Sequence, residues 1–344
     1  MNCTIPGPNI KVLSKLINAL SKIGDDVYVE AKKDYLSLKS VNMTTTAYCT
    51  VHLRDTFFSS YEVSQIDLQC RIPVKGMLSV FKSFSHKDKK MEFCKIELEE
   101  DPVKIVFRFK YKHDVMVVRA LFLSDGEAVN IVYNKDNNTS YLGATAQLFG
   151  QVLCNFQLHD DDMSLDVTSQ RALIRNYITG DTAVTKGVRS QITLMAGEFS
   201  SFKITRDTNI TFSLKPFRAA VSLAETTTLG MLLNFDAPGR PALIEVKNPT
   251  FEVNFVIATL KSNDVPSTLT SSAVPIMNDV NWEDFTDPMD LPEKENGDVI
   301  TRSPESTHST KIRRIFGRCY EDTFHPQMAD LGEVLAPDSD PDTD

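Results

Sequence analysis

The chain has 344 residues, 42% of them hydrophobic, which suits about two domains with packed cores. No apolar run approaches the roughly 20 residues of a membrane-spanning helix, and residues 1–8 lack the basic-then-apolar order of a signal peptide, so we expect a soluble intracellular protein. The net charge of −9 is uneven, because residues 1–261 carry +3 and residues 262–344 carry −12. This division predicts a mildly basic folded body followed by an acidic segment.

The first part of the body alternates helical and strand patterns. A helix is predicted over 10–23, because Leu13, Leu16 and Leu20 recur on one face, and Asp25-Asp26 follow at a turn. A second helix is predicted over 75–84. Strands are predicted over 27–30, 35–41, 47–53, 68–74, 92–98, 104–109, 115–122 and 129–133. Helices on one face of a mainly antiparallel sheet predict an α+β domain over 1–133.

The second part repeats this arrangement. A helix is predicted over 144–158 with Leu148, Val152 and Phe156 inward, followed by the turn at 160–162 and by a further helix over 215–223. Strands are predicted over 163–167, 172–178, 210–214, 231–235, 242–246 and 252–260. The strand-to-helix joints Val74-Lys75 and Leu214-Lys215 lie 140 residues apart, and the Asp clusters lie about as far apart. We infer a duplication, with roughly eight strands and two helices in each domain.

The duplication fixes the expected domain boundaries. The first domain covers 1–133 and the second covers 142–261, joined by the polar linker 134–141. Residues 262–344 combine Ser, Thr, Pro and acidic residues, a composition that does not bury enough apolar surface to offset chain entropy. We expect this segment to be largely disordered.

Cationic side chains recur along one side of three predicted helices. At about 100° per residue, the first helix places Lys11, Lys15, Asn18 and Lys22 in one stripe, the second Lys75, Ser79, Lys82, His86 and Lys89, and the fourth Lys215, Arg218 and Ser222. Such stripes suit a phosphate backbone read without sequence preference, although a single stripe is more often a solvated surface. The third helix offers only Gln147, Gln151 and Cys154, so we expect weaker nucleic-acid contact in the second domain.

Several segments resemble one family. They are IKVLSK at 10–15, SKIGDD at 21–26, LSLKSVN at 36–42, FFSSY at 57–61, FDAPGRPA at 235–242 and NFVIATL at 254–260. Together they resemble the Rad-nine family of checkpoint clamp subunits, and FDAPGRPA is the most specific of them. The resemblance implies a fold like that of the proliferating-cell nuclear antigen (PCNA), a DNA sliding clamp.

The resemblance also implies partners. Family members form a heterotrimeric ring, the nine-one-one complex, with Rad-one and Hus-one subunits, and a clamp loader places it on double-stranded DNA in the nucleus. The helices would then face the DNA, and edge strands near 129–133 and 189–196 would join neighbouring subunits. A homotrimeric replication clamp is the alternative, which the long acidic segment and the closer match to Rad-nine disfavour.

The acidic segment carries candidate regulatory sites. Ser339 is followed by Asp340 and Asp342, an arrangement that suits an acid-directed kinase, and Ser303 precedes a proline. The end of the chain resembles the family's terminal phosphorylation site, which implies recruitment of a BRCT-repeat checkpoint scaffold. The segment with Lys311, Arg313, Arg314 and Phe316 resembles the family's basic-aromatic patch.

The sequence lacks several common enzyme and metal-binding motifs. The chain has no G-x-x-x-x-G-K-[ST], G-x-S-x-G or H-E-x-x-H motif, and its six cysteines lack zinc-site spacing, so no catalytic, metal or cofactor site is expected. Asp160-Asp161-Asp162 beside His159 leaves a metal-dependent exonuclease as a third hypothesis. Because Asp25-Asp26 occupy the matching turn, a turn-forming role explains these residues more simply.

Overall fold

The computed structural model describes residues 1–63, 68–81, 91–98, 103–124, 139–177 and 188–260. All of these residues lie in one compact unit, Met1–Pro304. The predicted strand 129–133, residues 82–90 of the second helix region, and the whole segment 262–344 with its phosphorylation and basic-aromatic sites therefore lie outside the described residues.

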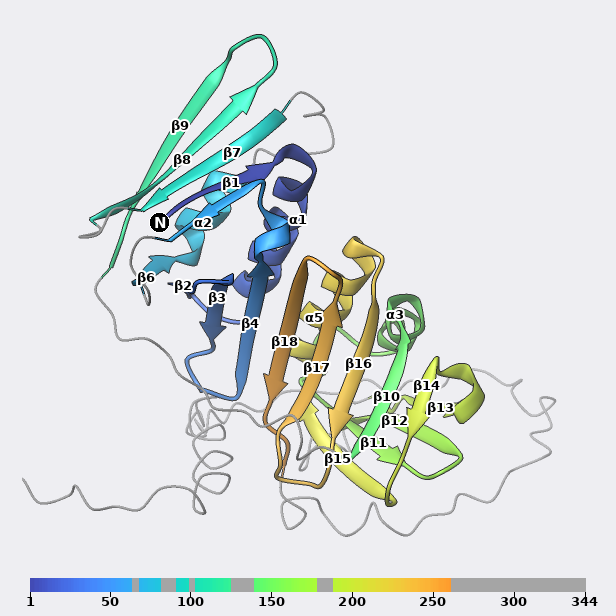
Figure 1. The fold of residues 1–344 in the computed structure, drawn as a ribbon. Helices are drawn as coiled ribbons and strands as arrows, with labels where there is room; N and C mark the ends of the chain where they lie inside the picture. The colour runs from blue at the N-terminus through green and yellow to red at the C-terminus, as the bar shows by residue number, and fades with distance from the viewer. Residues whose placement is uncertain (64–67, 82–90, 99–102, 125–138, 178–187, 261–344) are drawn as a thin grey trace, which may run out of the picture. The chain divides into compact units, whose positions relative to one another are not determined.

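The first domain begins with a strand, and two helices are inserted between its strands (Figure 1). Its helices are α1 (Gly7–Ser21) and α2 (Val74–Phe81), with a short 3-10 helix, η1 (Asp55–Phe57). Its strands are β1 (Asn2–Pro6), β2 (Asp26–Ala31), β3 (Tyr35–Val41), β4 (Ala47–Arg54), β5 (Ser60–Glu62), β6 (Leu68–Pro73), β7 (Met91–Leu98), β8 (Lys104–Tyr111) and β9 (Met116–Phe122).

The second domain repeats the order of the first. Its helices are α3 (Ala146–Cys154) and α5 (Leu214–Thr227), with η3 (Ala196–Glu198). Its strands are β10 (Ser140–Thr145), β11 (Asp162–Val167), β12 (Arg171–Tyr177), β13 (Gln191–Met195), β14 (Ser201–Lys203), β15 (Thr208–Ser213), β16 (Gly230–Phe235), β17 (Ala242–Lys247) and β18 (Phe251–Ile257). Helices α2 and α5 each follow a strand directly, and they begin 140 residues apart, in agreement with the predicted duplication.

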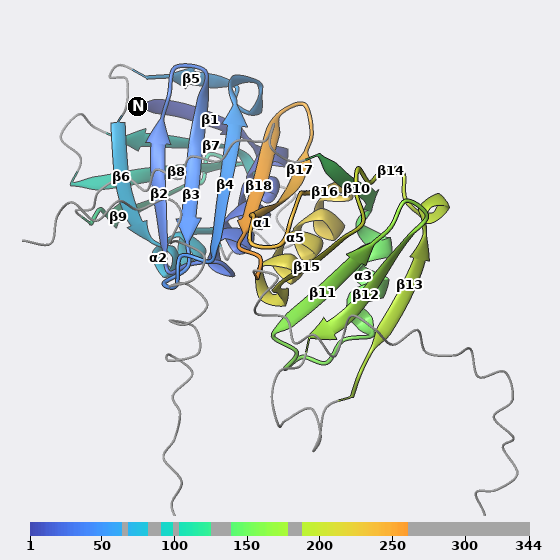
Figure 2. The ribbon, with the colours of Figure 1, turned by 90° about the horizontal axis from the view of Figure 1, so that it is seen from below.

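The described strands form three sheets, and every pairing between these strands is antiparallel. Their orders are β5-β1-β7-β8-β9, β14-β10-β16-β17-β18-β4-β3-β2-β6 and β13-β12-β11-β15. The nine-stranded sheet crosses both domains, because β18 pairs with β4 from Phe251↔Leu53 to Ile257↔Ala47 (Figure 2). Backbone hydrogen bonds therefore join the two domains into one sheet, and Phe57 packs edge-on against Phe251 at this seam.

Local sequence explains the helix boundaries. Ile10, Leu13, Leu16, Ile17 and Leu20 of α1 are buried, and Pro8 in its first turn lets the helix begin at Gly7, three residues before the predicted start. The predicted helix 144–158 was too long, because residues 140–145 form β10 and α3 covers only Ala146–Cys154. Thr145 starts α3 by accepting a hydrogen bond from the Leu148 backbone N–H at 3.3 Å.

The strand predictions missed several short elements. Strands β1, β5, β10 and β14 were not predicted, although β1 directly precedes α1 and β10 directly precedes α3. Residues 140 and 141 of the predicted linker 134–141 belong to β10, while 134–138 lie outside the described residues.

Candidate nucleic-acid interface

The four α-helices among the described residues form a layer that continues across both domains. Helix α2 packs on α1, α1 packs on α5, and α5 packs on α3. Each helix buries an apolar face, for example Met77 and Val80 of α2 and Phe217 and Val221 of α5. The opposite sides of α1, α2 and α5 carry the cationic residues predicted to face DNA.

Two lysines of α1 connect the domains through hydrogen bonds. The Lys15 Nζ donates to the backbone carbonyl of Thr226, near the C-terminus of α5. The Lys22 Nζ donates to the Ser222 hydroxyl at 2.9 Å. Both acceptors are neutral, so the lysines keep their positive charge and add to the positive potential of the helix layer. Lys11 is half-buried and has no hydrogen-bond or ion-pair partner among the described residues.

Helix α2 presents Lys75 and Ser79 to solvent, while Lys82 and Lys89 lie outside the described residues. Its C-terminal end is held by Arg119 of β9, whose Nη1 donates to the carbonyls of Ser79 at 2.7 Å and Val80 at 2.9 Å. The guanidinium satisfies carbonyls that the helix leaves without partners. Sequence reasoning missed this contact, because the two elements lie about 40 residues apart and carry no local signal of it.

The second domain supplies Lys215 and Arg218 from the first turns of α5. Lys215 is exposed, and Arg218 donates from Nη2 to the Gln157 carbonyl at 2.7 Å. Helix α3 exposes Gln147, Gln151 and Cys154, none of which carries a charge. The structure thus brings the α1 and α5 cations together at the domain junction and leaves the α3 side neutral.

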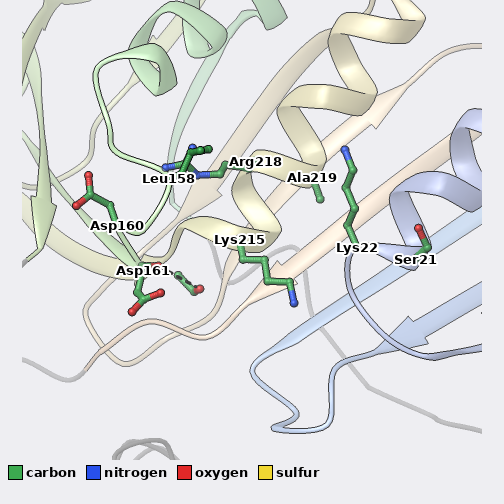
Figure 3. A pocket seen from close by; sticks show the side chains of 9 residues that line it. Ser21, Lys22, Leu158, Asp160, Asp161, Lys215, Arg218 and Ala219 are labelled. Atoms are coloured by element: carbon green, nitrogen blue, oxygen red, sulfur yellow. Dashed lines mark hydrogen bonds between the residues drawn. The ribbon is translucent and has the colours of Figure 1, made fainter. Parts of the chain in front are cut away.

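A cavity of about 490 Å³ lies where α1 meets α5 (Figure 3). We call it the junction cavity. Its lining comes from the end of α1, the turn after α3 and the start of α5: Ser21, Lys22, Leu158, Asp160, Asp161, Ser213, Lys215, Arg218 and Ala219. Three cations and two carboxylates therefore share one concave surface between the domains.

The three carboxylates of the turn after α3 serve different purposes. Asp160 accepts hydrogen bonds from the Gln157 backbone N–H at 2.8 Å and from Asn176 at 3.3 Å, which closes the turn. Asp161 is exposed. The pKa of Asp162 is raised to about 6, mainly because its own carboxyl group is buried and secondly because the charge of Asp161 lies nearby. Within the described ranges, no group of three or more His, Cys, Asp or Glu side chains is arranged to hold a metal ion.

The thiols of the core are poorly ionised. Burial raises the pKa of Cys3 and Cys70 to about 12 and also raises those of Cys49 and Cys94. None of these four thiols forms a disulfide, and Cys319 lies outside the described residues. Among the described helices, none has the length and apolar character needed to cross a bilayer.

Sequence comparison identifies the family. A family model described as Rad9 matches residues 13–260, which span most of both domains. The chain belongs to the Rad9 family. It is 26% identical over 267 residues to the cell cycle checkpoint control protein Rad9 of Drosophila melanogaster, covering 77% of this chain and 58% of that protein. It is 22% identical over 305 residues to the DNA repair protein rad9 of Schizosaccharomyces pombe, covering 77% of this chain and 71% of that protein.

The Rad9 match does not extend over whole relatives. With the cell cycle checkpoint protein hpr-9 of Caenorhabditis elegans, 24% identity covers 74% of this chain and 52% of the relative. The matched region thus spans a little over half the length of the Drosophila and Caenorhabditis relatives.

Solved structures show the fold. A proliferating cellular nuclear antigen from Entamoeba histolytica superimposes with a TM-score of 0.62 at 12% identity, covering 75% of this chain and 98% of that one. A chain of the PCNA2-PCNA3 complex from Sulfolobus tokodaii gives a TM-score of 0.60 at 13% identity, covering 75% of this chain and 99% of that one. This Rad9 family chain therefore has the PCNA-like clamp fold that its sequence predicted.

Proposed function

We propose that the chain is one subunit of a heterotrimeric DNA damage checkpoint clamp that encircles double-stranded DNA without sequence preference. The observation that carries the proposal is the continuous helix layer, with unneutralised cations on the side away from the core. Lys11, Lys75 and Lys215 have no ion-pair partner within 4 Å among the described residues, so these charges are available to phosphates. Lys15, Lys22 and Arg218 add positive charge through donors held by neutral acceptors.

Two open sheet edges support ring assembly. Strands β9 and β13 each lie at the end of a sheet, and neither has a second neighbour among the described strands. The other edges are shorter or partly covered: β5 and β14 have three residues each, β6 is bridged at Arg71↔Ser124, and β15 at Phe212↔Thr259. Two different open edges on one subunit suit head-to-tail contacts, which close into a ring when the rotation permits.

Along both edge strands, every second residue directs its backbone N–H and C=O groups to the open side of the sheet. Leu123 N–H donates to the Val103 carbonyl at 3.0 Å, so odd-numbered residues of β9 bond to β8 and the even-numbered ones turn to the open side. In β13, Ala196 N–H donates to the Gln170 carbonyl at 2.9 Å, which leaves Gln191, Thr193 and Met195 facing outward. Exposed Met116, Val118 and Phe122 on β9 add apolar surface beside that edge.

The remaining parts of the proposal rest on family membership. The partners proposed are Rad-one-like and Hus-one-like subunits, a clamp loader that places the ring on DNA, and a BRCT-repeat scaffold bound by the phosphorylated C-terminal segment, all in the nucleus. Ser339 is the principal proposed phosphorylation site and Ser303 the second. The basic-aromatic patch, which lies in the same segment, is proposed as a further contact site.

The first test is the mass of the full chain, purified alone and then with candidate Rad-one-like and Hus-one-like subunits. We expect a monomer alone and a one-to-one-to-one complex with both partners. A homotrimer of the chain alone would contradict the proposal and favour a replication clamp.

A further inference from the structure

Helix α2 is held at its C-terminal end by side chains of two other elements. It has only eight residues, and a helix of that length is marginal without tertiary contacts. The Arg119 Nη1 donates to the carbonyls of Ser79 at 2.7 Å and Val80 at 2.9 Å. The Ser14 hydroxyl of α1 donates to the Phe81 carbonyl at 3.4 Å. The guanidinium supplies the two shorter bonds and a positive charge at the negative end of the helix dipole, so it is the stronger of the two supports.

Arg119 lies on β9, the end strand of the five-stranded sheet (Figure 1). Val117 and Leu121, which share its side of the strand, are half-buried and pack against the core. Leu121 also lies close to α2, because a methyl group added at Gly76 would be 3.3 Å from its Cδ2 atom. Helix α2 is therefore anchored to an edge strand by two charge-assisted hydrogen bonds and by close packing.

Strand β9 is itself held on one side only. Among the described strands it pairs with β8 alone, and its open side is the proposed contact with a neighbouring subunit. Elements with few partners open locally at a lower free energy than the centre of a sheet. When β9 opens, Arg119 and Leu121 withdraw from α2, and the end of the helix loses its support. A neighbouring subunit paired with β9 would hold the strand from both sides and keep Arg119 in place.

We propose that Arg119 is a positioning residue that couples subunit contact at β9 to the order of α2. This inference rests on the proposed ring assembly and adds a consequence that edge pairing alone does not have. Assembly lowers the population of opened β9, and the guanidinium passes this effect to the carbonyls of Ser79 and Val80. Because coupling free energies are reciprocal, any ligand that favours the ordered end of α2 also favours assembly at β9.

Backbone hydrogen exchange measures this coupling. The amides of residues 78–81 are followed in the full chain alone and in its complex with Rad-one-like and Hus-one-like subunits. In the wild-type protein they should exchange about tenfold more slowly in the complex, because two hydrogen bonds to a charged group are no longer lost by local opening of β9. In Arg119→Gln most of this difference between the two states should disappear, and the packing of Leu121 accounts for what remains.

Ser14→Ala is the matched control for this measurement. It removes a hydrogen bond from the same end of α2, but Ser14 lies on α1 and not on the sheet edge. Exchange should become faster in both states, while the ratio between the states stays that of the wild-type protein. A purely structural role of Arg119 would give this same pattern in Arg119→Gln, and that result would overturn the proposal.

A second variant and the mass measurement separate the remaining outcomes. Arg119→Met keeps an unbranched apolar stem beside α2 but has no donor, so it should lose the ratio in the same way if Arg119→Gln does not fold. If the wild-type complex forms and the amides exchange equally in both states, the coupling is overturned while the ring proposal stands. If no complex forms, the mass measurement shows it, and both proposals fail.

Discussion

Replacing Ala120 by proline tests the proposed ring contact, because it removes one backbone N–H from the edge of β9. Ala120 is exposed on β9, and as an even-numbered residue it directs its N–H to the open side of the strand. Proline removes that donor and places a ring in the path of an added strand, but it leaves the bonds between β9 and β8 intact. Edge strands tolerate proline at such positions, so the subunit should still fold.

The expected magnitude follows from one hydrogen bond of the strand pair. An acceptor on the neighbouring subunit left without its partner costs about 1–3 kcal/mol, which weakens association by about 5- to 150-fold. The assay is the dissociation constant of the assembled complex, measured by mass as the subunits are diluted. Ala120→Val keeps the N–H with a residue that favours strands, so it is the matched control.

Two results would refute this reasoning. If the Ala120→Pro and Ala120→Val proteins assemble equally well, β9 does not pair with a neighbouring subunit. If Ala120→Pro lowers the unfolding midpoint in urea by much more than Ala120→Val, the strand is not free on that side in the folded chain, and weaker assembly carries no information about the ring.

Three further predictions concern DNA contact, pH dependence and the C-terminal segment. Changing Lys11 and Lys75 together to Gln should reduce the log–log salt slope of duplex binding by about 1.8, at about 0.9 for each lost phosphate contact, and an unchanged slope would contradict their placement facing DNA. The raised pKa of Asp162, about 6, means that the folded state binds a proton more tightly than the unfolded state, so stability should fall as pH rises from about 4 to 6. Asp162→Asn should remove that fall and stabilise the chain at pH 7 by at most about 3 kcal/mol, measured by urea unfolding at both ends of the range; parallel curves for both proteins would contradict the assignment. Ser339→Ala should leave assembly intact and abolish binding of a BRCT-repeat scaffold after kinase treatment, whereas lost assembly would point to a structural role of the segment.

Periodicity within single elements made much of the fold predictable. The apolar face of α1 and the repeated strand-to-helix joints, predicted at Val74-Lys75 and Leu214-Lys215, identified the duplication, because burial imposes a period of 3.6 on helices and two on strands. Strand β1 was not predicted, because its five residues are too few to show a clear alternation and end in Pro6. The predicted linker extended into β10 for a similar reason, because Gly143 interrupts the alternation of side chains in that strand.

Contacts between distant parts of the chain left no such signal. The pairing of β18 with β4 joins residues about 200 positions apart, and neither strand differs locally from one paired within its own domain. The role of the segment FDAPGRPA is visible only in three dimensions, where the Asp236 carboxylate accepts from Arg240 at 2.6 Å and from Arg206 at 3.4 Å. The sequence resemblance located this segment, but only the structure gives it a role in fixing the loop between β16 and β17.

The α1 lysines show why a stripe on a helical wheel does not assign one role to each member. Lys15 and Lys22 lie in the predicted stripe with Lys11, yet each donates one hydrogen bond to α5 across the domain junction. An ammonium group has three donors, so the same lysine can hold α5 and contact a phosphate at once. Neutral substitutions at these two positions therefore weaken the junction and the DNA contact together, and their effects do not separate. Lys11 and Lys75, which lack partners among the described residues, are the positions at which DNA contact alone is measured.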